Sequence, residues 1–229
     1  MYIFIAITII LAYLIGSIPN AVWIGKVFYG IDVRKEGSKN AGATNTFRVL
    51  GWKPGLVVLV LDFLKGALPL ALQFFLICPF YPHLCSVDYM HILIWMRIAM
   101  AIAIVLGHVF PIYVGFRGGK GVATLVGVLL LLYPIEFFMV ATVFFTVFFL
   151  FRYVSLASMC AAVSLPVISF VHTLWVCWGW DSTDSFYILN SPLFIFAILI
   201  AVFVPLTHIK NIKRLIRGEE PKFVFKKHS

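Results

Sequence analysis

A short polar segment, residues 37–48, lies between two long apolar runs and reads Gly-Ser-Lys-Asn-Ala-Gly-Ala-Thr-Asn-Thr-Phe-Arg. Its hydroxyl and amide groups can bond to an oxyanion, its glycines keep the backbone flexible, and Arg48 is a fixed cation that suits phosphate. This pattern predicts a phosphate site at a membrane surface. The candidate contacts are its polar side chains, namely Ser38, Asn40, Thr44, Asn45 and Arg48.

A second candidate phosphate site is the glycine-rich run at residues 117–121, Arg-Gly-Gly-Lys-Gly. Glycine permits backbone conformations closed to other residues and lets N–H groups approach an oxyanion, while Lys120 adds charge. The run is not a nucleotide-binding P-loop, because Val114 stands where that pattern needs its first glycine. The residues expected to bind phosphate here are Gly118, Gly119, Lys120 and Gly121.

A third polar cluster follows the last apolar run. On a helix, His208 and Asn211 lie three residues apart on one face, so an imidazole and an amide could meet the same ligand. The basic residues around them are explained singly by membrane topology and contact with lipid phosphate. A functional site is favoured because all three polar clusters fall on the same predicted side of the membrane.

One charged pair lies inside an apolar run. Asp62 and Lys65 are spaced to pair across one helical turn, and such groups are costly in a membrane unless they are paired or face water. Structural pairing and a direct role in the site both remain open for them.

The elements that must position these groups are membrane helices. Hydrophobic residues make up 62% of the 229 residues, charged residues 12%, and the mean hydropathy is +1.04. A soluble domain could not cover that much apolar surface. We therefore expect an all-α integral membrane protein that forms a single membrane-embedded domain over residues 1–229.

The apolar runs predict about seven transmembrane helices of roughly 20 residues each. They span residues 2–28, 55–78, 92–112, 120–134, 135–151, 155–178 and 192–209. Only Tyr133 and Pro134 separate the short fourth and fifth runs, so a six-span or re-entrant version stays open. Pro134 is expected to mark the turn between them.

The basic residues indicate an orientation. With seven spans, the segments rich in Lys and Arg all fall on one side, which the positive-inside rule makes cytoplasmic. The opposite connections, around residues 80–90 and 179–190, contain Asp but neither Lys nor Arg. We expect the N-terminus outside and the C-terminus in the cytoplasm. The net charge of +9 then indicates contact with anionic lipid rather than with nucleic acid.

In order along the chain, these motifs resemble the bacterial acyl-phosphate-dependent glycerol-3-phosphate acyltransferases of the PlsY family. The resemblance runs nearly end to end. It rests on residues 16–19, 37–48, Asp62, Lys65-Gly66, 107–124, 152–158, and on His208, Asn211, Arg214 and Gly218. Two positions depart from the family pattern: Lys39 stands where a glycine is typical, and Ile209 stands where an arginine commonly follows the histidine.

The resemblance implies a reaction in phospholipid biosynthesis at the bacterial cytoplasmic (inner) membrane, with the active site facing the cytoplasm. A fatty acyl group would move from acyl phosphate to the 1-hydroxyl of sn-glycerol 3-phosphate, giving lysophosphatidate (1-acylglycerol 3-phosphate) and phosphate. It also implies that residues 117–121 bind glycerol 3-phosphate. The implied catalytic residues are Ser38, Arg48, Lys120, His208 and Asn211.

No convincing covalent nucleophile is present, so we expect direct attack on the acyl group. The base is either His208 or the donor's own phosphate. Neither a metal nor a cofactor is expected, because no Cys or His cluster has the required spacing. A Cys78–Cys85 disulfide, the acyl-chain preference and the oligomeric state are left open by the sequence.

Two rival classes of function rank lower. An anion transporter would usually show internal repeats or helices broken near the midplane, and no repeat is evident here. A lipid-binding scaffold would have no need of the 37–48 segment. A His-x4-Asp pattern at His83 and Asp88 matches another acyltransferase family, but it falls on the predicted outer side.

Overall fold

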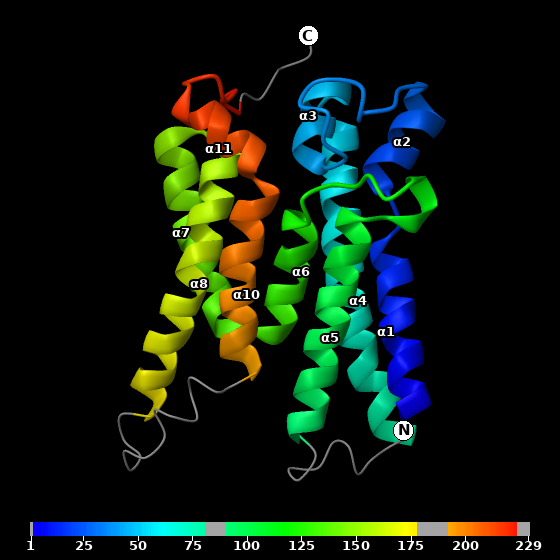
Figure 1. Ribbon diagram of the computed structural model, residues 1–229, viewed down its shortest axis with the longest axis vertical. Coiled ribbons are helices and arrows are strands. Elements are labelled where there is room, and N and C mark those ends of the chain that lie inside the picture. Colours follow the sequence, from blue (N-terminus) through cyan, green and yellow to red (C-terminus); the bar gives the residue numbers. More distant parts are fainter. Residues whose placement is uncertain (1, 81–89, 178–191, 224–229) are drawn as a thin grey trace. The chain divides into compact units, whose positions relative to one another are not determined.

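The computed structural model describes residues 2–80, 90–177 and 192–223, and within these ranges every regular element is a helix (Figure 1). The all-α prediction is therefore confirmed for the described residues. The described chain divides into two compact units, which meet in the sequence between Leu132 and Tyr133. The single domain expected over residues 1–229 stays a prediction.

The first unit contains six α-helices and one 3-10 helix among its described residues. These are α1 (Tyr2–Gly16), α2 (Asn20–Tyr29), α3 (Ala43–Leu50), α4 (Trp52–Phe80), α5 (Met90–Val109), η3 (Ile112–Val114) and α6 (Val122–Leu132). Helix α1 packs along α5, and α4 packs along α6. Small residues allow these close approaches: a Cβ on Gly107 would lie 2.8 Å from the Ser17 nitrogen, and one on Gly66 would overlap the Thr124 carbonyl.

The first predicted span, residues 2–28, is not one continuous helix. It breaks between α1 and α2 with a bend of 40°, because Pro19 has no N–H to continue the ladder. The break exposes backbone carbonyls inside an apolar unit, where each needs a donor. Lys65 Nζ donates to the Ile18 carbonyl at 2.8 Å, and Asn20 Nδ2 donates to Asp62 Oδ1 at 2.9 Å.

Asp62 and Lys65 form the ion pair that their spacing allows. Lys65 Nζ lies 3.0 Å from Asp62 Oδ1, and the side chains are 5% and 2% exposed respectively. Both partners also form hydrogen bonds to residues at the break between α1 and α2, so the pair stabilises this break. The structure therefore explains why an apolar helix carries two charges.

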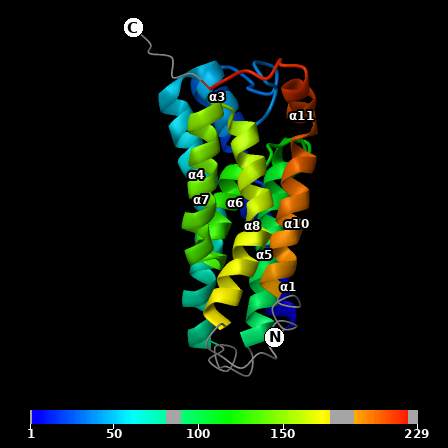
Figure 2. The same cartoon turned by 90° about the vertical axis from the view of Figure 1, so that its left-hand side faces the viewer.

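The second unit contains α7 (Pro134–Phe151), α8 (Val154–Cys177), α10 (Pro192–Thr207) and α11 (Ile209–Ile216). Figure 2 shows α7, α8 and α10 side by side, with α8 packed against both neighbours. The chain turns by 61° between α10 and α11. Pro134 is the first residue of α7, which confirms it as the boundary between the fourth and fifth predicted spans.

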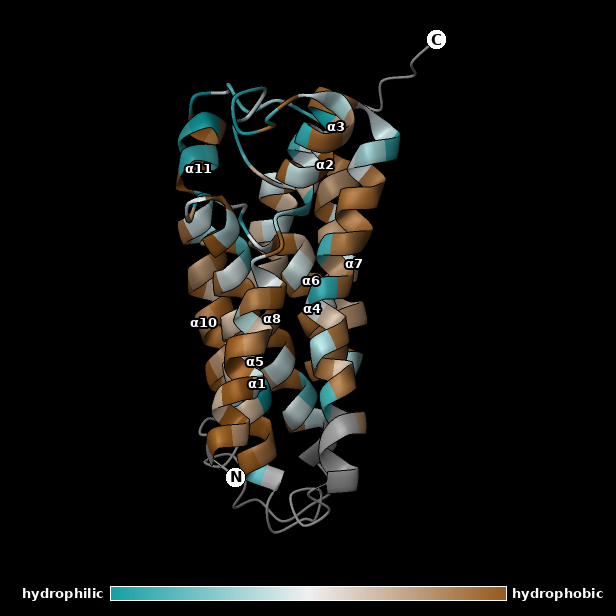
Figure 3. Cartoon of the chain, turned by 90° about the vertical axis from the view of Figure 1, so that its right-hand side faces the viewer, coloured by the Kyte–Doolittle hydropathy of each residue, from teal (hydrophilic) through white to brown (hydrophobic). Residues whose placement is uncertain are grey.

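The helices support several membrane spans, but they do not confirm the number seven. Among the described residues, four helices are long and apolar enough to cross a membrane, and up to six spans result if each bent pair counts as one. Helix α6, with 11 residues, rises only about 17 Å, against roughly 30 Å of hydrocarbon. In Figure 3 the long helices are mostly hydrophobic, while α11 is largely hydrophilic.

Two questions raised by the sequence, the Cys78–Cys85 disulfide and the His83/Asp88 pattern, depend on groups outside the described part of the structure. Cys85 and the His83/Asp88 pattern fall in residues 81–89, and the side chain of Cys78 is not described either. The question of a Cys78–Cys85 bridge therefore keeps its status as a prediction.

Candidate functional site

Asn45 organises the first polar segment. Its side chain is fully buried at the start of α3, and its Oδ1 accepts hydrogen bonds from the Ser38 backbone N–H at 2.8 Å and from the Ser38 hydroxyl at 3.0 Å. Its Nδ2 donates to the carbonyls of Val33 and Glu36 at 2.7 and 3.1 Å. These four bonds fold the loop before α3 onto the helix and fix Ser38 in place. The structure thus gives Asn45 a positioning role, and its predicted contact with phosphate stays a prediction.

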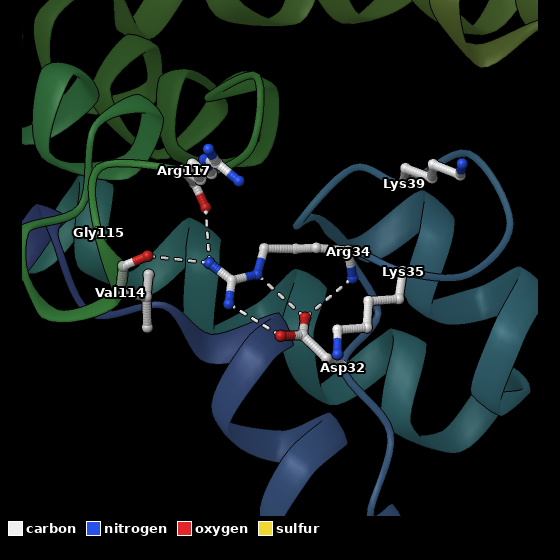
Figure 4. Close-up of a pocket in the computed structure, with 8 residues that line it drawn as sticks. Asp32, Arg34, Lys35, Lys39, Val114, Gly115 and Arg117 are labelled. Atoms are coloured by element: carbon white, nitrogen blue, oxygen red, sulfur yellow. Dashed lines mark hydrogen bonds and ion pairs between the residues drawn. The ribbon is translucent and has the colours of Figure 1, made fainter.

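Arg34 joins the two predicted phosphate loops. Its Nε and Nη2 donate to Asp32 Oδ1 and Oδ2 at 3.0 and 2.8 Å, a bidentate pair. Its Nη1 donates to the carbonyls of Val114 at 2.9 Å and Arg117 at 3.3 Å. Figure 4 shows this guanidinium between the Asp32 carboxylate and the two carbonyls. The loop before α3 is therefore tied to the loop before α6.

The same residues line a surface pocket of about 600 Å³ in the first unit (Figure 4). Its charged lining consists of Asp32, Arg34, Lys35, Lys39 and Arg117. The hydrogen bond from Arg34 holds the pKa of the Asp32 carboxyl well below its ordinary value. That carboxylate is matched by Arg34, so the pocket keeps an excess of positive charge, which favours an anionic ligand.

The glycine-rich run is built differently from its predicted form. Only Gly121 of its three glycines has a left-handed backbone, with φ of +80°. The N–H groups of Gly118 and Gly119 donate to the carbonyls of Val109 and His108 at 3.1 and 3.2 Å. These two amides therefore fasten the loop to the end of α5. Phosphate binding by Gly118 and Gly119 stays a prediction. Lys120, half-buried, follows Gly119, and Gly121 separates it from the start of α6.

Gly119 is required by close contact rather than by its dihedral angles. A Cβ there would overlap His108 Nε2 and would lie 2.6 Å from the Ala41 carbonyl oxygen. The glycine-rich run and the 37–48 segment, far apart in the sequence, thus meet at this residue. The structure brings both predicted phosphate segments to one end of the first unit.

The other predicted contacts of the 37–48 segment lie around this junction. Thr44 and Arg48 are half-buried on α3, and Asn40 is half-buried just before it. Lys39 occupies a left-handed conformation with φ of 59°, which is unusual for a residue other than glycine. Whether these side chains bind phosphate stays a prediction.

His208 and Asn211 belong to the second unit, and no continuous helix carries both. His208 caps α11 at the bend after α10, and Asn211 lies inside α11. His208 Nδ1 lies 2.8 Å from the Val204 carbonyl, which can only accept a hydrogen bond. A neutral His208 ring therefore has its proton on Nδ1 and its lone pair on Nε2.

Glu220 is the centre of a buried cluster that the sequence did not reveal. Its Oε1 accepts from Asn211 Nδ2 at 2.6 Å and from the Ser155 hydroxyl at 2.8 Å, and its Oε2 accepts from Arg214 Nε at 2.7 Å. Burial acts to raise the pKa of Glu220, but these hydrogen bonds outweigh it and hold the pKa below its ordinary value. The carboxylate therefore fixes the Asn211 side chain.

Asp32, Arg34 and Glu220 were not among the predicted site residues. Asp32 and Arg34 are two residues apart, a spacing that occurs by chance in many loops. Glu220 follows a basic helix, and nothing in the local sequence marks it as buried. Among the described residues, no group of three or more His, Cys, Asp or Glu side chains is placed to hold a metal ion.

Together, these features define a class of protein: a helical membrane protein whose polar loops bring hydroxyl groups and cations together. Comparison with known families is more specific. The chain belongs to the glycerol-3-phosphate acyltransferase family, whose model matches residues 6–218.

Curated relatives align over nearly the whole chain. It is 42% identical over 219 residues to a glycerol-3-phosphate acyltransferase of Fusobacterium nucleatum, covering 95% of this chain and 97% of the relative. It is 44% identical over 220 residues to one of Bacillus cytotoxicus, covering 96% and 95% respectively.

Two solved structures share the fold. Both are crystal structures of PlsY (YgiH), an integral membrane glycerol 3-phosphate acyltransferase. The glycerol 3-phosphate form matches with a TM-score of 0.73 and 36% identity, and the lysophosphatidic acid form with 0.71 and 35%. Each comparison covers 96% of both chains. The predicted family is thereby confirmed.

Proposed function

We propose that this protein transfers a fatty acyl group from acyl phosphate to the 1-hydroxyl of glycerol 3-phosphate, releasing lysophosphatidate and inorganic phosphate. The observation that carries the proposal is the junction in the first unit, where Arg34 and Gly119 bring the Ser38 loop against the Lys120 loop. Family membership and the relatives' glycerol-3-phosphate acyltransferase names support the acceptor. The donor is inferred from the resemblance of the sequence motifs.

The reaction requires the protein to bind and orient its two substrates more than to provide covalent catalysis. The 1-hydroxyl oxygen attacks the acyl carbon, a new ester C–O bond forms, and the bond from the acyl carbon to the phosphate oxygen breaks. Because acyl phosphate is a mixed anhydride, its phosphate is already a good leaving group. Holding two anions together in the right geometry then supplies most of the acceleration.

We assign the charged and hydroxyl groups of the first unit to the phosphates. Lys120 and Arg48 would neutralise phosphate charge, and Ser38, held by Asn45, would donate its hydroxyl proton to a phosphate oxygen. In this state the Ser38 hydroxyl turns away from Asn45, while its backbone N–H keeps the loop anchored. Thr44 and Asn40 are proposed as further phosphate contacts. The glycines of residues 117–121 would serve by allowing the close packing of the loop that carries Lys120.

The proton of the attacking hydroxyl goes either to the donor's phosphate or to His208. The lone pair of a neutral His208 lies on Nε2, since Nδ1 faces the Val204 carbonyl. Asn211 donates from its amide nitrogen to Glu220, which holds its side chain in place. Both residues are proposed as catalytic on the sequence pattern of the family.

We also propose seven membrane passes in a bacterial inner membrane. Helix α6 would count as a short seventh pass beside the four long helices and two bent pairs. The Lys and Arg residues of residues 34–53, 117–120 and 210–217, together with Arg152, would then face the cytoplasm. The N-terminus would be outside.

The test is a donor comparison with purified protein in detergent or lipid. Glycerol 3-phosphate would be supplied with a long-chain acyl phosphate, or with the same acyl group as its coenzyme A or carrier-protein thioester. We expect lysophosphatidate from acyl phosphate alone. Product from a thioester at a comparable rate would overturn the donor assignment, and no product with any donor, from folded protein, would overturn the acyltransferase proposal.

A further inference from the structure

His108 is a buried imidazole near the end of α5 to which no role has been given so far. Its side chain is 6% exposed, and its ring lies where three helices meet. Nδ1 lies 3.1 Å from the Thr124 hydroxyl on α6 and 3.7 Å from Asp62 Oδ1 on α4. One edge of the ring is therefore committed to polar partners inside the helical unit.

Those partners are themselves held in place. Asp62 Oδ1 also accepts from Asn20 Nδ2 at 2.9 Å and pairs with Lys65, which bonds to the Ile18 carbonyl. The carboxylate is thus tied to the break between α1 and α2. Because these partners are held by their own bonds, the edge of the ring that faces them has little freedom to move.

The opposite edge of the ring supports the glycine-rich loop. A Cβ on Gly119 would overlap His108 Nε2, so the Gly119 backbone rests on this nitrogen. The Ala41 carbonyl lies on another side of the same residue, 2.6 Å from where that Cβ would be. Gly119 is therefore wedged between the imidazole and the 37–48 segment, one residue before Lys120.

We propose that His108 is a positioning residue for the phosphate site: contact with its imidazole fixes the position of the Gly119 backbone and thereby places Lys120 against the 37–48 segment. Because the ring packs against the Gly119 backbone, we assign it an action through the loop. The kinetic consequence rests on the proposed function, because it assumes that Lys120 binds the phosphate of glycerol 3-phosphate. The structural consequence, that the ring holds the loop in place, does not depend on the proposed function.

Two substitutions distinguish the contribution of the Nδ1 edge of the ring from that of the Nε2 edge. In His108→Asn the amide can occupy the place of Nδ1 and keep the link to Thr124, but no side-chain atom reaches Gly119, which keeps only its backbone hydrogen bond to residue 108. In His108→Gln the longer side chain can place a polar atom where Nε2 was. We expect His108→Asn to raise the KM for glycerol 3-phosphate about tenfold, equivalent to about 1.4 kcal/mol of binding, and His108→Gln to raise it less than about threefold.

The KM for acyl phosphate and the melting temperature should change little in either variant. The matched control is His172→Gln in the second unit, where an imidazole paired with Glu136 at 3.0 Å is removed far along the chain from the loop. This control should leave the KM for glycerol 3-phosphate unchanged. Equal effects of both His108 variants on kcat and folded yield, without a change in this KM, would show a merely structural residue and overturn the proposal.

A second measurement is independent of catalysis. Amide hydrogen exchange of a peptide covering residues 117–121 should be faster in His108→Asn than in wild type and His108→Gln, while a peptide from α7 stays unchanged. Unchanged exchange of residues 117–121 would overturn the proposal whatever the enzyme's substrates are. Faster exchange in a protein that makes no lysophosphatidate would instead keep the positioning role and refute the proposed function.

Discussion

The carbonyl oxygen of the Asn45 side chain accepts two hydrogen bonds from Ser38, one from the backbone N–H and one from the hydroxyl. The same amide donates two bonds to the loop carbonyls of Val33 and Glu36. Ser38 is therefore presented by a buried clamp that fixes both its backbone and its side chain. We therefore expect substitutions of Ser38, the proposed phosphate contact, and of Asn45, which positions it, to have different effects on activity and on stability.

Ser38→Ala and Asn45→Asp should differ in stability although both lose activity. Asn45→Asp removes both donated bonds and buries a charge beside two carbonyls, so we expect a loss of about 1–3 kcal/mol per unsatisfied group and a lower melting temperature. Ser38→Ala leaves the clamp's bonds to Val33 and Glu36 intact. Its melting temperature should stay near that of wild type while kcat/KM falls at least about tenfold. A stable, active Asn45→Asp variant would contradict the clamp.

The Arg34 tie between the two loops requires a guanidinium. Lysine keeps the charge but cannot bond to both Asp32 oxygens and also reach the Val114 and Arg117 carbonyls. We expect Arg34→Lys to lower kcat/KM for glycerol 3-phosphate about tenfold. Arg217→Lys, an exposed arginine after α11, is the matched control and should behave as wild type. Equal kinetics of the two variants would mean that the tie does not matter for the site.

Glu220 should give the protein a component of stability that depends on pH. Its pKa is lowered in the folded state, so this component is present above the ordinary pKa of a glutamate, 4.5, and is lost as pH falls through the lowered value. Glu220→Gln lacks this titration. The difference in melting temperature between wild type and Glu220→Gln should be largest near about pH 6 and should shrink toward about pH 3. A constant difference would show that the carboxylate charge is not what stabilises the cluster.

Lys39 combines an unfavourable backbone conformation with a charge that lines the pocket. Lys39→Gly relieves a left-handed conformation that costs roughly 1 kcal/mol, so the melting temperature should not fall. It also removes positive charge, so kcat/KM for glycerol 3-phosphate should drop at low salt and approach that of wild type near 1 M salt, where screening is nearly complete. A drop of the same size at both salt concentrations would exclude an electrostatic role.

Much of the architecture could be read from the sequence because apolar runs and small residues dictate helices in a membrane. The Asp62–Lys65 pair was predictable from its spacing of one turn. The break at Ile18 and Pro19 was not predicted, because hydropathy stays high across it. The bend at His208 was not predicted either, because in the sequence the C-terminal basic run looks continuous with α10. The tasks of Arg34, Glu220 and His108 depend on contacts between residues distant in sequence, and no local pattern encodes such contacts.

The central claim, acyl transfer from acyl phosphate to glycerol 3-phosphate, is tested most directly by measuring both products in one reaction. Purified protein, acyl phosphate and glycerol 3-phosphate would be mixed, and phosphate and lysophosphatidate would be quantified over the same time course. The account predicts equimolar formation of both products, dependent on glycerol 3-phosphate and absent in Lys120→Met. Phosphate release without lysophosphatidate would contradict the acyl transfer, and lysophosphatidate formation that persists in Lys120→Met would contradict the role of Lys120.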